Sequence, residues 1–158
     1  MSRQLYLDCD GVLADFVKGA AALLGTHPRR YEEKHGLGKF SQMLALAPDF
    51  YFSLPLLPDA MRLFDAVRHL DPVILTGLPR GNWAGDQKMR WAAGHFPGVR
   101  MITCMARNKG DHAKEGDVLV DDHVKYPHLW EQGGGIFVHH RSADETLSAL
   151  ADYFPLRA

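Results

Sequence analysis

The sequence lacks the features that would place the chain outside the ordinary soluble globular proteins. Only two of its 158 residues are cysteines, which excludes a disulfide framework. No apolar run approaches the roughly 20 residues that a membrane-spanning helix needs, and there is no internal repeat or low-complexity segment. The length therefore predicts one domain, with a core large enough to fold without disulfides or metals.

The chain also lacks a charge excess. Its formal net charge is -1 and it has no long basic run, which argues against binding to a nucleic-acid polymer or a membrane surface. The first residues, MSRQ, are polar and lead into a short apolar run rather than a secretory signal. We therefore expect a cytoplasmic protein. The sequence leaves open whether it forms a homodimer, and a small anionic substrate is compatible because that needs only local positive charge.

Short apolar runs alternate with helical patterns along the chain. The predicted strands are residues 5–7, 73–76, 99–104, 118–120 and 136–138. The predicted helices include residues 14–24, a helix with Pro58 in its first turn, a helix around residues 83–93, and a last helix marked by residues 147–154. This alternation predicts an α/β fold with a doubly wound, Rossmann-like parallel sheet of about five strands.

Residues 26–58 interrupt the alternation. The stretch contains three prolines before Pro58 and an aromatic cluster, Phe50, Tyr51 and Phe52, but only a weak periodic pattern. Because it is too long for a plain loop, we interpret it as a small helical insertion or lid.

Polar groups suited to phosphate chemistry follow four of the five predicted strands. In chain order they are Asp8 and Asp10, then Thr76 with the Gly77 amide, then Lys109, and finally Asp121 with Asp122. The carboxyl ends of parallel strands meet at one edge of the sheet, where open α/β sheets bind their ligands. We therefore expect these groups to converge on one site.

Together these groups would suffice for phosphoryl transfer. Aspartate oxygens are hard ligands that suit Mg²⁺, which offsets the repulsion between a carboxylate and a phosphate. The hydroxyl of Thr76, the amide of Gly77 and the ammonium of Lys109 can hold phosphate oxygens. Asp10 can protonate a leaving group and later activate water. The predicted metal-binding residues are Asp8, Asp10, Asp121 and Asp122.

The motifs DCDGV at residues 8–12, VILTG ending in Thr76 and Gly77, Lys109, and DVLVDD ending in Asp122 resemble the haloacid dehalogenase superfamily of aspartate-nucleophile phosphatases. They occur in the order of that superfamily and span most of the chain. Within it, DGVLADF, FYFSLPLLPDA, LTG followed by KMRW, and GDVLVDD resemble the 5'(3')-deoxyribonucleotidase family.

This resemblance implies a single domain, residues 1–158, with a small helical cap inserted at about residues 17–58. It implies that Asp8 is the nucleophile and Asp10 the acid/base. The implied activity is a Mg²⁺-dependent phosphomonoesterase that forms an aspartyl-phosphate. Its substrate would be a small phosphorylated molecule, namely a nucleoside monophosphate. By the same resemblance, Phe50, Phe52 and Trp83 are candidates for the walls around the substrate.

Several alternatives stay open at this point. Lys114 could replace Lys109 at the phosphate, and either Asp121 or Asp122 could bind the ion. A dehalogenase is disfavoured because displacing a halide needs no acid/base such as Asp10. A phospho-accepting signalling module would carry an aspartate where this chain has Cys104. A phosphatase for another small metabolite and a phosphate-binding homologue without turnover both fit the sequence.

Overall fold

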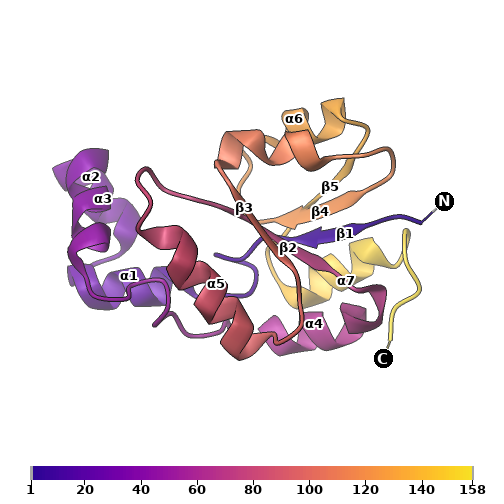
Figure 1. The fold of residues 1–158 in the computed structure, drawn as a ribbon, viewed down its shortest axis with the longest axis horizontal. Coiled ribbons are helices and arrows are strands. Elements are labelled where there is room, and N and C mark those ends of the chain that lie inside the picture. The colour runs from indigo at the N-terminus through magenta and orange to yellow at the C-terminus, as the bar shows by residue number, and fades with distance from the viewer. Residues whose placement is uncertain (1, 158) are drawn as a thin grey trace.

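Five parallel strands form the centre of the molecule, and helices cover both faces of the sheet (Figure 1). The computed structural model describes residues 2–157. The strands are β1 (Leu5–Leu7), β2 (Val73–Gly77), β3 (Met101–Cys104), β4 (Val118–Asp121) and β5 (Ile136–His139). Their order in the sheet is β3-β2-β1-β4-β5. The predicted doubly wound α/β fold is confirmed.

The two faces of the sheet carry two cores. One face packs against α4 (Ala60–Val67), α5 (Ala84–His95) and α7 (Ala143–Leu150), and the other against α6 (Pro127–Gln132) and the 3-10 helix η2 (Ala106–His112) (Figure 1). Side chains alternate between the faces of a strand. Leu5 and Leu7 accordingly lie in the larger core, whereas Tyr6 contacts Trp130 in the smaller one.

Three helices lie between β1 and α4, within the segment interpreted as an insertion. They are α1 (Phe16–Leu24), α2 (Pro28–His35) and α3 (Leu37–Leu46). Gly25 ends α1 in the left-handed conformation, with φ 76°, and Pro28 starts α2, as expected for helix boundaries. In Figure 1, α2 and α3 stand apart from the sheet, beyond the carboxyl ends of its strands.

Some boundaries differ from those predicted. The helix expected to hold Pro58 in its first turn begins at Ala60, because the Ala60 N–H still bonds to the Leu57 carbonyl in a preceding turn. The third strand begins at Met101 rather than at residue 99, since the Val99 N–H closes a turn onto Phe96. The short helix η1 (Arg68–Leu70) follows α4 directly. No helix within residues 2–157 is both long and apolar enough to cross a membrane.

Candidate active site

A tight turn after β1 presents Asp8 and Asp10 at the carboxyl edge of the sheet. The Cys9 carbonyl accepts hydrogen bonds from the backbone N–H groups of residues 12, 13 and 14, at 3.2, 2.8 and 2.9 Å. Gly11 has a φ of 84°, which only glycine adopts at little cost. A Cβ at this position would collide with the Asp122 carboxylate. Glycine therefore lets the turn lie directly against the end of β4.

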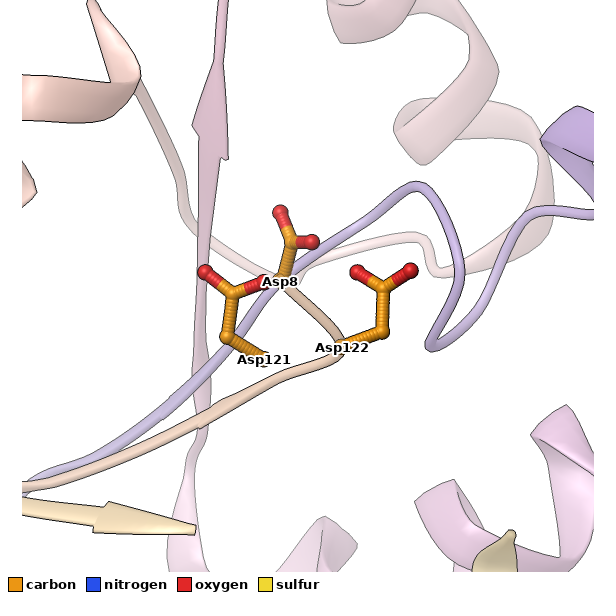
Figure 2. Close-up of side chains that lie close together, drawn as sticks. All are labelled: Asp8, Asp121 and Asp122. Carbon is orange, nitrogen blue, oxygen red and sulfur yellow. The ribbon is translucent and has the colours of Figure 1, made fainter. Parts of the chain in front are cut away.

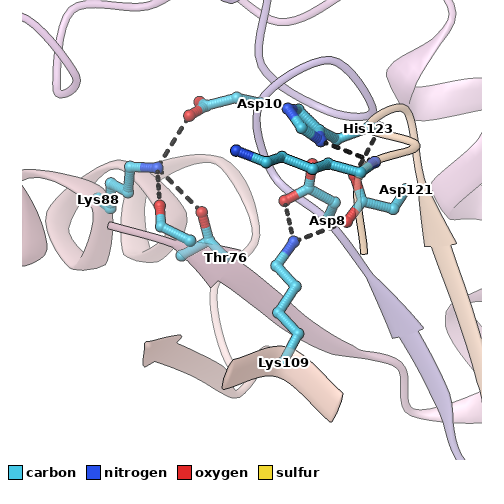
Figure 3. Close-up of polar contacts among 9 residues, drawn as sticks. Asp8, Asp10, Thr76, Lys88, Lys109, Asp121 and His123 are labelled. Atoms are coloured by element: carbon cyan, nitrogen blue, oxygen red, sulfur yellow. Dashed lines mark hydrogen bonds and ion pairs between the residues drawn. The ribbon is translucent and has the colours of Figure 1, made fainter. Parts of the chain in front are cut away.

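Lys109 joins Asp8 to Asp121 in a buried ion-pair cluster (Figure 3). Its Nζ lies 2.8 Å from Asp8 Oδ1 and 2.9 Å from Asp121 Oδ2. The strand register places the two carboxylates side by side, because Leu7 of β1 is opposite Val120 of β4. By alternation both point to the face of the sheet where η2 carries Lys109.

Burial and charge act against each other in this cluster. Burial raises the pKa of Asp8, and the Lys109 ammonium opposes that rise. Burial alone would lower the pKa of Lys109, but its ion pairs with Asp8 and Asp121 raise that pKa above its usual value. Lys109 therefore stays charged and can hold Asp8 as a carboxylate.

Three carboxylates converge beside this lysine (Figure 2). Asp8, Asp121 and Asp122 each offer an oxygen within 4.8 Å of the others. Desolvation, together with the negative charges of Asp8 and Asp121, raises the pKa of Asp122 to about 8. A cation would relieve this repulsion, and a donor set made only of carboxylate oxygens fits Mg²⁺.

The two neighbouring aspartates of β4 are held differently. Both oxygens of Asp121 are engaged, Oδ2 by Lys109 and Oδ1 by the backbone N–H of His123 at 2.9 Å. Within residues 2–157, Asp122 makes no ion pair with a lysine or arginine. Asp122 is therefore the better placed of the two to bind a metal ion directly.

A second lysine, to which the sequence interpretation gives no role, organises Asp10 (Figure 3). Lys88 Nζ donates to Asp10 Oδ2 at 2.8 Å, to Thr76 Oγ1 at 3.0 Å and to the Gly77 carbonyl at 2.9 Å. The side chain of Lys88 is only 3% exposed. The carboxylate of Asp10 thus lies in this second cluster, and the group of three carboxylates consists of Asp8, Asp121 and Asp122.

The two lysines approach from opposite faces of the sheet. Thr76 lies on the larger-core face of β2, where α5 packs, because it is two residues from Ile74 in that core. Lys88 belongs to the buried face of α5, together with Ala84, Trp91 and Ala92. A lysine on an otherwise apolar helix face is the signal that could have revealed this residue from the sequence.

The end of β2 is tightly enclosed. Gly77 pairs with Cys104 in the sheet and lines the cavity, and a Cβ on Gly77 would come within 3.0 Å of the Ala106 Cβ at the start of η2. Thr76 and Gly77, both predicted to bind phosphate, thus lie at the cavity wall beside Lys88.

A cavity of about 850 Å³ opens over these groups. Its lining includes Asp8, Asp10, Lys109, Asp121 and Asp122. Its aromatic lining residues are Phe16, Tyr51, Tyr126, Trp130 and Phe137. The rings of Phe16 and Tyr51 stack with centroids 6.2 Å apart. The predicted phosphate-chemistry residues are therefore brought together at one opening.

The three aromatic residues expected to contact substrate lie around Tyr51 rather than in the cavity lining. Phe50 is buried and packs edge-on against Tyr51. Trp83 is tilted against the other side of Tyr51, at a centroid distance of 5.3 Å. Phe52 is exposed and lies under the guanidinium of Arg90. Sequence alone does not distinguish the inward-facing Tyr51 from its two neighbours.

Two further side chains near the site have no predicted role. Cys9 is buried between the two aspartates, and burial together with the charge of Asp10 raises the pKa of its thiol, as expected for a packed spacer. His140 is buried, lines the cavity, and has its Nδ1 2.7 Å from Thr146 Oγ1. Burial lowers the pKa of His140, which favours the neutral ring.

Comparisons with known proteins give matches only at the level of structure. No protein-family model and no curated protein sequence matches the chain. The L-2-haloacid dehalogenase from Xanthobacter autotrophicus with chloropropionic acid covalently bound superposes with a TM-score of 0.58 at 14% identity. That superposition covers 98% of this chain and 85% of the dehalogenase.

Two other solved structures are similar to a comparable degree. A dehalogenase with an intermediate complex gives a TM-score of 0.57 at 13% identity, covering 87% of this chain and 84% of that one. A hydrolase from Streptococcus pneumoniae gives 0.54 at 13% identity, covering 96% and 100%. Similarity at such low identity concerns the fold, so the resemblance to the haloacid dehalogenase superfamily is confirmed at that level. The chain has the haloacid dehalogenase fold.

Proposed function

We propose that this protein is a Mg²⁺-dependent phosphomonoesterase that forms an aspartyl-phosphate on Asp8 and acts on nucleoside monophosphates. The observation that carries the proposal is the pair of lysine clusters at one cavity. Lys109 holds Asp8 beside Asp121, and Lys88 holds Asp10 beside Thr76. Two carboxylates in separate, individually supported positions are what a nucleophile and an acid/base require.

In the first step, Asp8 attacks the phosphorus through Oδ2, the oxygen that Lys109 does not bind. The bond between phosphorus and the ester oxygen breaks, and Asp10 gives a proton to the departing alcohol. The structure supports this role for Asp10, because Oδ2 is fixed by Lys88 while Oδ1 has no hydrogen-bond partner within residues 2–157. Bound Mg²⁺ would supply the positive charge that offsets repulsion between carboxylate and phosphate.

In the second step, Asp10 takes a proton from a water molecule that attacks the aspartyl-phosphate. The bond between phosphorus and the Asp8 oxygen breaks, which releases inorganic phosphate and restores the Asp8 carboxylate. Lys109 and Thr76 both line the cavity, which supports the proposal that they hold phosphate oxygens as charge develops.

The test is phosphate release from p-nitrophenyl phosphate with and without Mg²⁺. Asp8→Asn should abolish turnover, and Asp10→Asn should slow it by about 10²- to 10⁴-fold. Asp15→Asn is a matched control, because Asp15 lines the same cavity but caps α1 by accepting from the Lys18 N–H, a bond that asparagine also accepts. Turnover retained in Asp8→Asn would refute the mechanism. Nucleoside monophosphates should give the highest kcat/KM in a broader panel of phosphomonoesters.

A second candidate activity is dehalogenation, which the structural similarity to two dehalogenases favours. Displacement of a halide by Asp8 would need neither Mg²⁺ nor the Asp10 and Lys88 pair. Chloride release from 2-chloropropionate that persists in EDTA and in Asp10→Asn would support this candidate over the phosphomonoesterase.

A further inference from the structure

The cavity has one wall that is nearly all apolar. This wall is made by residues from the turn before α1, from α1 itself, from the first residue of α3, from the segment before α4 and from the loop after β2. They are Ala14, Phe16, Val17, Leu37, Leu57 and Leu78. The wall faces the polar floor formed by the carboxylates and Lys109, and its α3 portion stands beyond the strand ends (Figure 1).

Two side chains of this wall are unusually exposed for their type. Val17 is 46% exposed and Leu37 is 63% exposed, and both line the cavity. Large apolar side chains that stay accessible at the mouth of a cavity are typical of a surface that a ligand covers. Covering them would gain about 25 cal/mol for each Å² of apolar area removed from water.

The same wall offers few partners to a polar ligand. Its carboxylate, Asp15, already accepts a hydrogen bond from the Lys18 N–H at 3.1 Å. The Tyr51 hydroxyl is the other polar group contributed by this region, and burial raises its pKa, which keeps it neutral. Further polar side chains of the lining, His123, Tyr126, His140 and Arg141, come from the segments after β4 and β5 and not from this wall. Hydroxyl groups of a sugar that lie against the wall would therefore find few partners, and each hydroxyl buried in that way is unfavourable.

We propose that the alcohol released by this site has an apolar or aromatic body, which Val17 and Leu37 select at the cavity mouth. The inference rests on the proposed phosphomonoesterase activity and names the part of the substrate that the phosphate chemistry leaves undefined. It predicts efficient turnover of nucleoside monophosphates, whose base is aromatic, and of aryl and long alkyl phosphates, and poor turnover of hexose phosphates.

The experiment compares kcat/KM for 2-naphthyl phosphate, glucose 6-phosphate and acetyl phosphate, an acyl phosphate whose acetate leaving group has no extended apolar body. Leu37→Asn should lower kcat/KM for 2-naphthyl phosphate by about tenfold, the effect expected for one lost apolar contact. It should lower kcat/KM for acetyl phosphate much less than for 2-naphthyl phosphate. Val17→Thr, which keeps the side-chain shape, should act in the same direction.

Leu46→Asn is the matched control. Leu46 lies in the same helix α3 and is 71% exposed, but it is not part of the cavity lining. This variant should leave all three substrates unchanged, and thermal melting should show that all variants remain folded.

The two proposals fail in different ways. If acetyl phosphate, 2-naphthyl phosphate and glucose 6-phosphate all lack Mg²⁺- and Asp8-dependent hydrolysis, the phosphomonoesterase itself is refuted. If acetyl phosphate is hydrolysed but glucose 6-phosphate matches 2-naphthyl phosphate, or Leu37→Asn behaves as Leu46→Asn does, only the apolar selection is refuted.

Discussion

Replacing Lys88 by methionine tests whether the second lysine holds Asp10 in place. Lys88 Nζ makes three hydrogen bonds of 2.8–3.0 Å from a side chain that is 3% exposed. Removing one partner of a buried ion pair costs about 3–5 kcal/mol. Because the Asp10 side chain is 25% exposed and keeps some access to water, we expect the lower end, about 3 kcal/mol. For a chain of this length, that loss lowers Tm by roughly 6–12 °C.

Urea unfolding of a double-mutant cycle would measure the coupling. Because the cost arises from an isolated Asp10 carboxylate, Lys88→Met combined with Asp10→Asn should cost less than the sum of the single changes, by about 1–3 kcal/mol. The exposed Lys39→Met is a control that should change stability by no more than about 0.5 kcal/mol. Turnover of p-nitrophenyl phosphate by Lys88→Met should fall by about 10²-fold or more. Additive stabilities, or turnover unchanged from wild type, would refute the reasoning.

Three other predictions concern the turn and the carboxylates. The pKa of Asp122 is about 8 in the metal-free folded protein, whereas an aspartate in the unfolded chain has a pKa near 4. Between these pH values the folded state holds a proton that the unfolded state has lost. The free energy of unfolding of the metal-free protein should therefore fall as pH rises from about 4 to 8. Bound Mg²⁺ should restore the lost stability, and its binding should release the Asp122 proton. Titration calorimetry in buffers of different ionisation enthalpy detects this proton release. Asp122→Asn should remove both the pH dependence and the proton release. A thiol reagent should modify the half-buried Cys104 in the native protein but the buried Cys9 only in denaturant. Burial raises the pKa of both thiols, but only the Cys9 thiol is inaccessible to the reagent. Equal modification rates of the two cysteines in the native protein would contradict this. Gly11→Ala should destabilise the fold by about 1–3 kcal/mol and weaken Mg²⁺ binding, because the new Cβ would collide with the Asp122 carboxylate. Urea unfolding would measure the stability and calorimetry the Mg²⁺ affinity. Unchanged values would contradict the close contact between the turn at Gly11 and Asp122.

The sequence is informative where position along the chain determines position in space. In a parallel sheet, residues that follow neighbouring strands must meet at one edge. This is why chain position is enough to bring together Asp8 and Asp121, which follow the neighbouring strands β1 and β4. Lys109 follows β3, which is not next to either strand, and reaches the two aspartates from η2. The register of β1 and β4 then sets the two aspartates side by side, as predicted from the apolar runs that precede them.

The sequence is less informative where side-chain direction decides. Lys88 lies on a helix, and its role depends on which face of α5 meets the sheet, so the strand ends alone do not identify it. Because Asp10 is only two positions from Asp8, the sequence interpretation includes it among the predicted metal-binding residues. In the structure, the turn after β1 directs the Asp10 carboxylate to Lys88. Both Phe50 and Tyr51 pack against Phe16, so among three consecutive aromatic residues only the folded structure identifies Tyr51 as the one that lines the cavity.

The reacting groups of the site and its apolar wall are held by different parts of the fold, because β1 lies at the centre of the sheet. The groups around Asp8 come from β2, β4 and the helices packed on them, so backbone ladders fix their spacing. Half of the apolar wall, namely Phe16, Val17 and Leu37, is contributed by α1 and α3, which no strand pairing constrains. Substitutions or length changes in those helices can alter which ester is accepted while the reacting groups stay in register. Under the proposed function, substrate preference could therefore diverge without any change in the reaction.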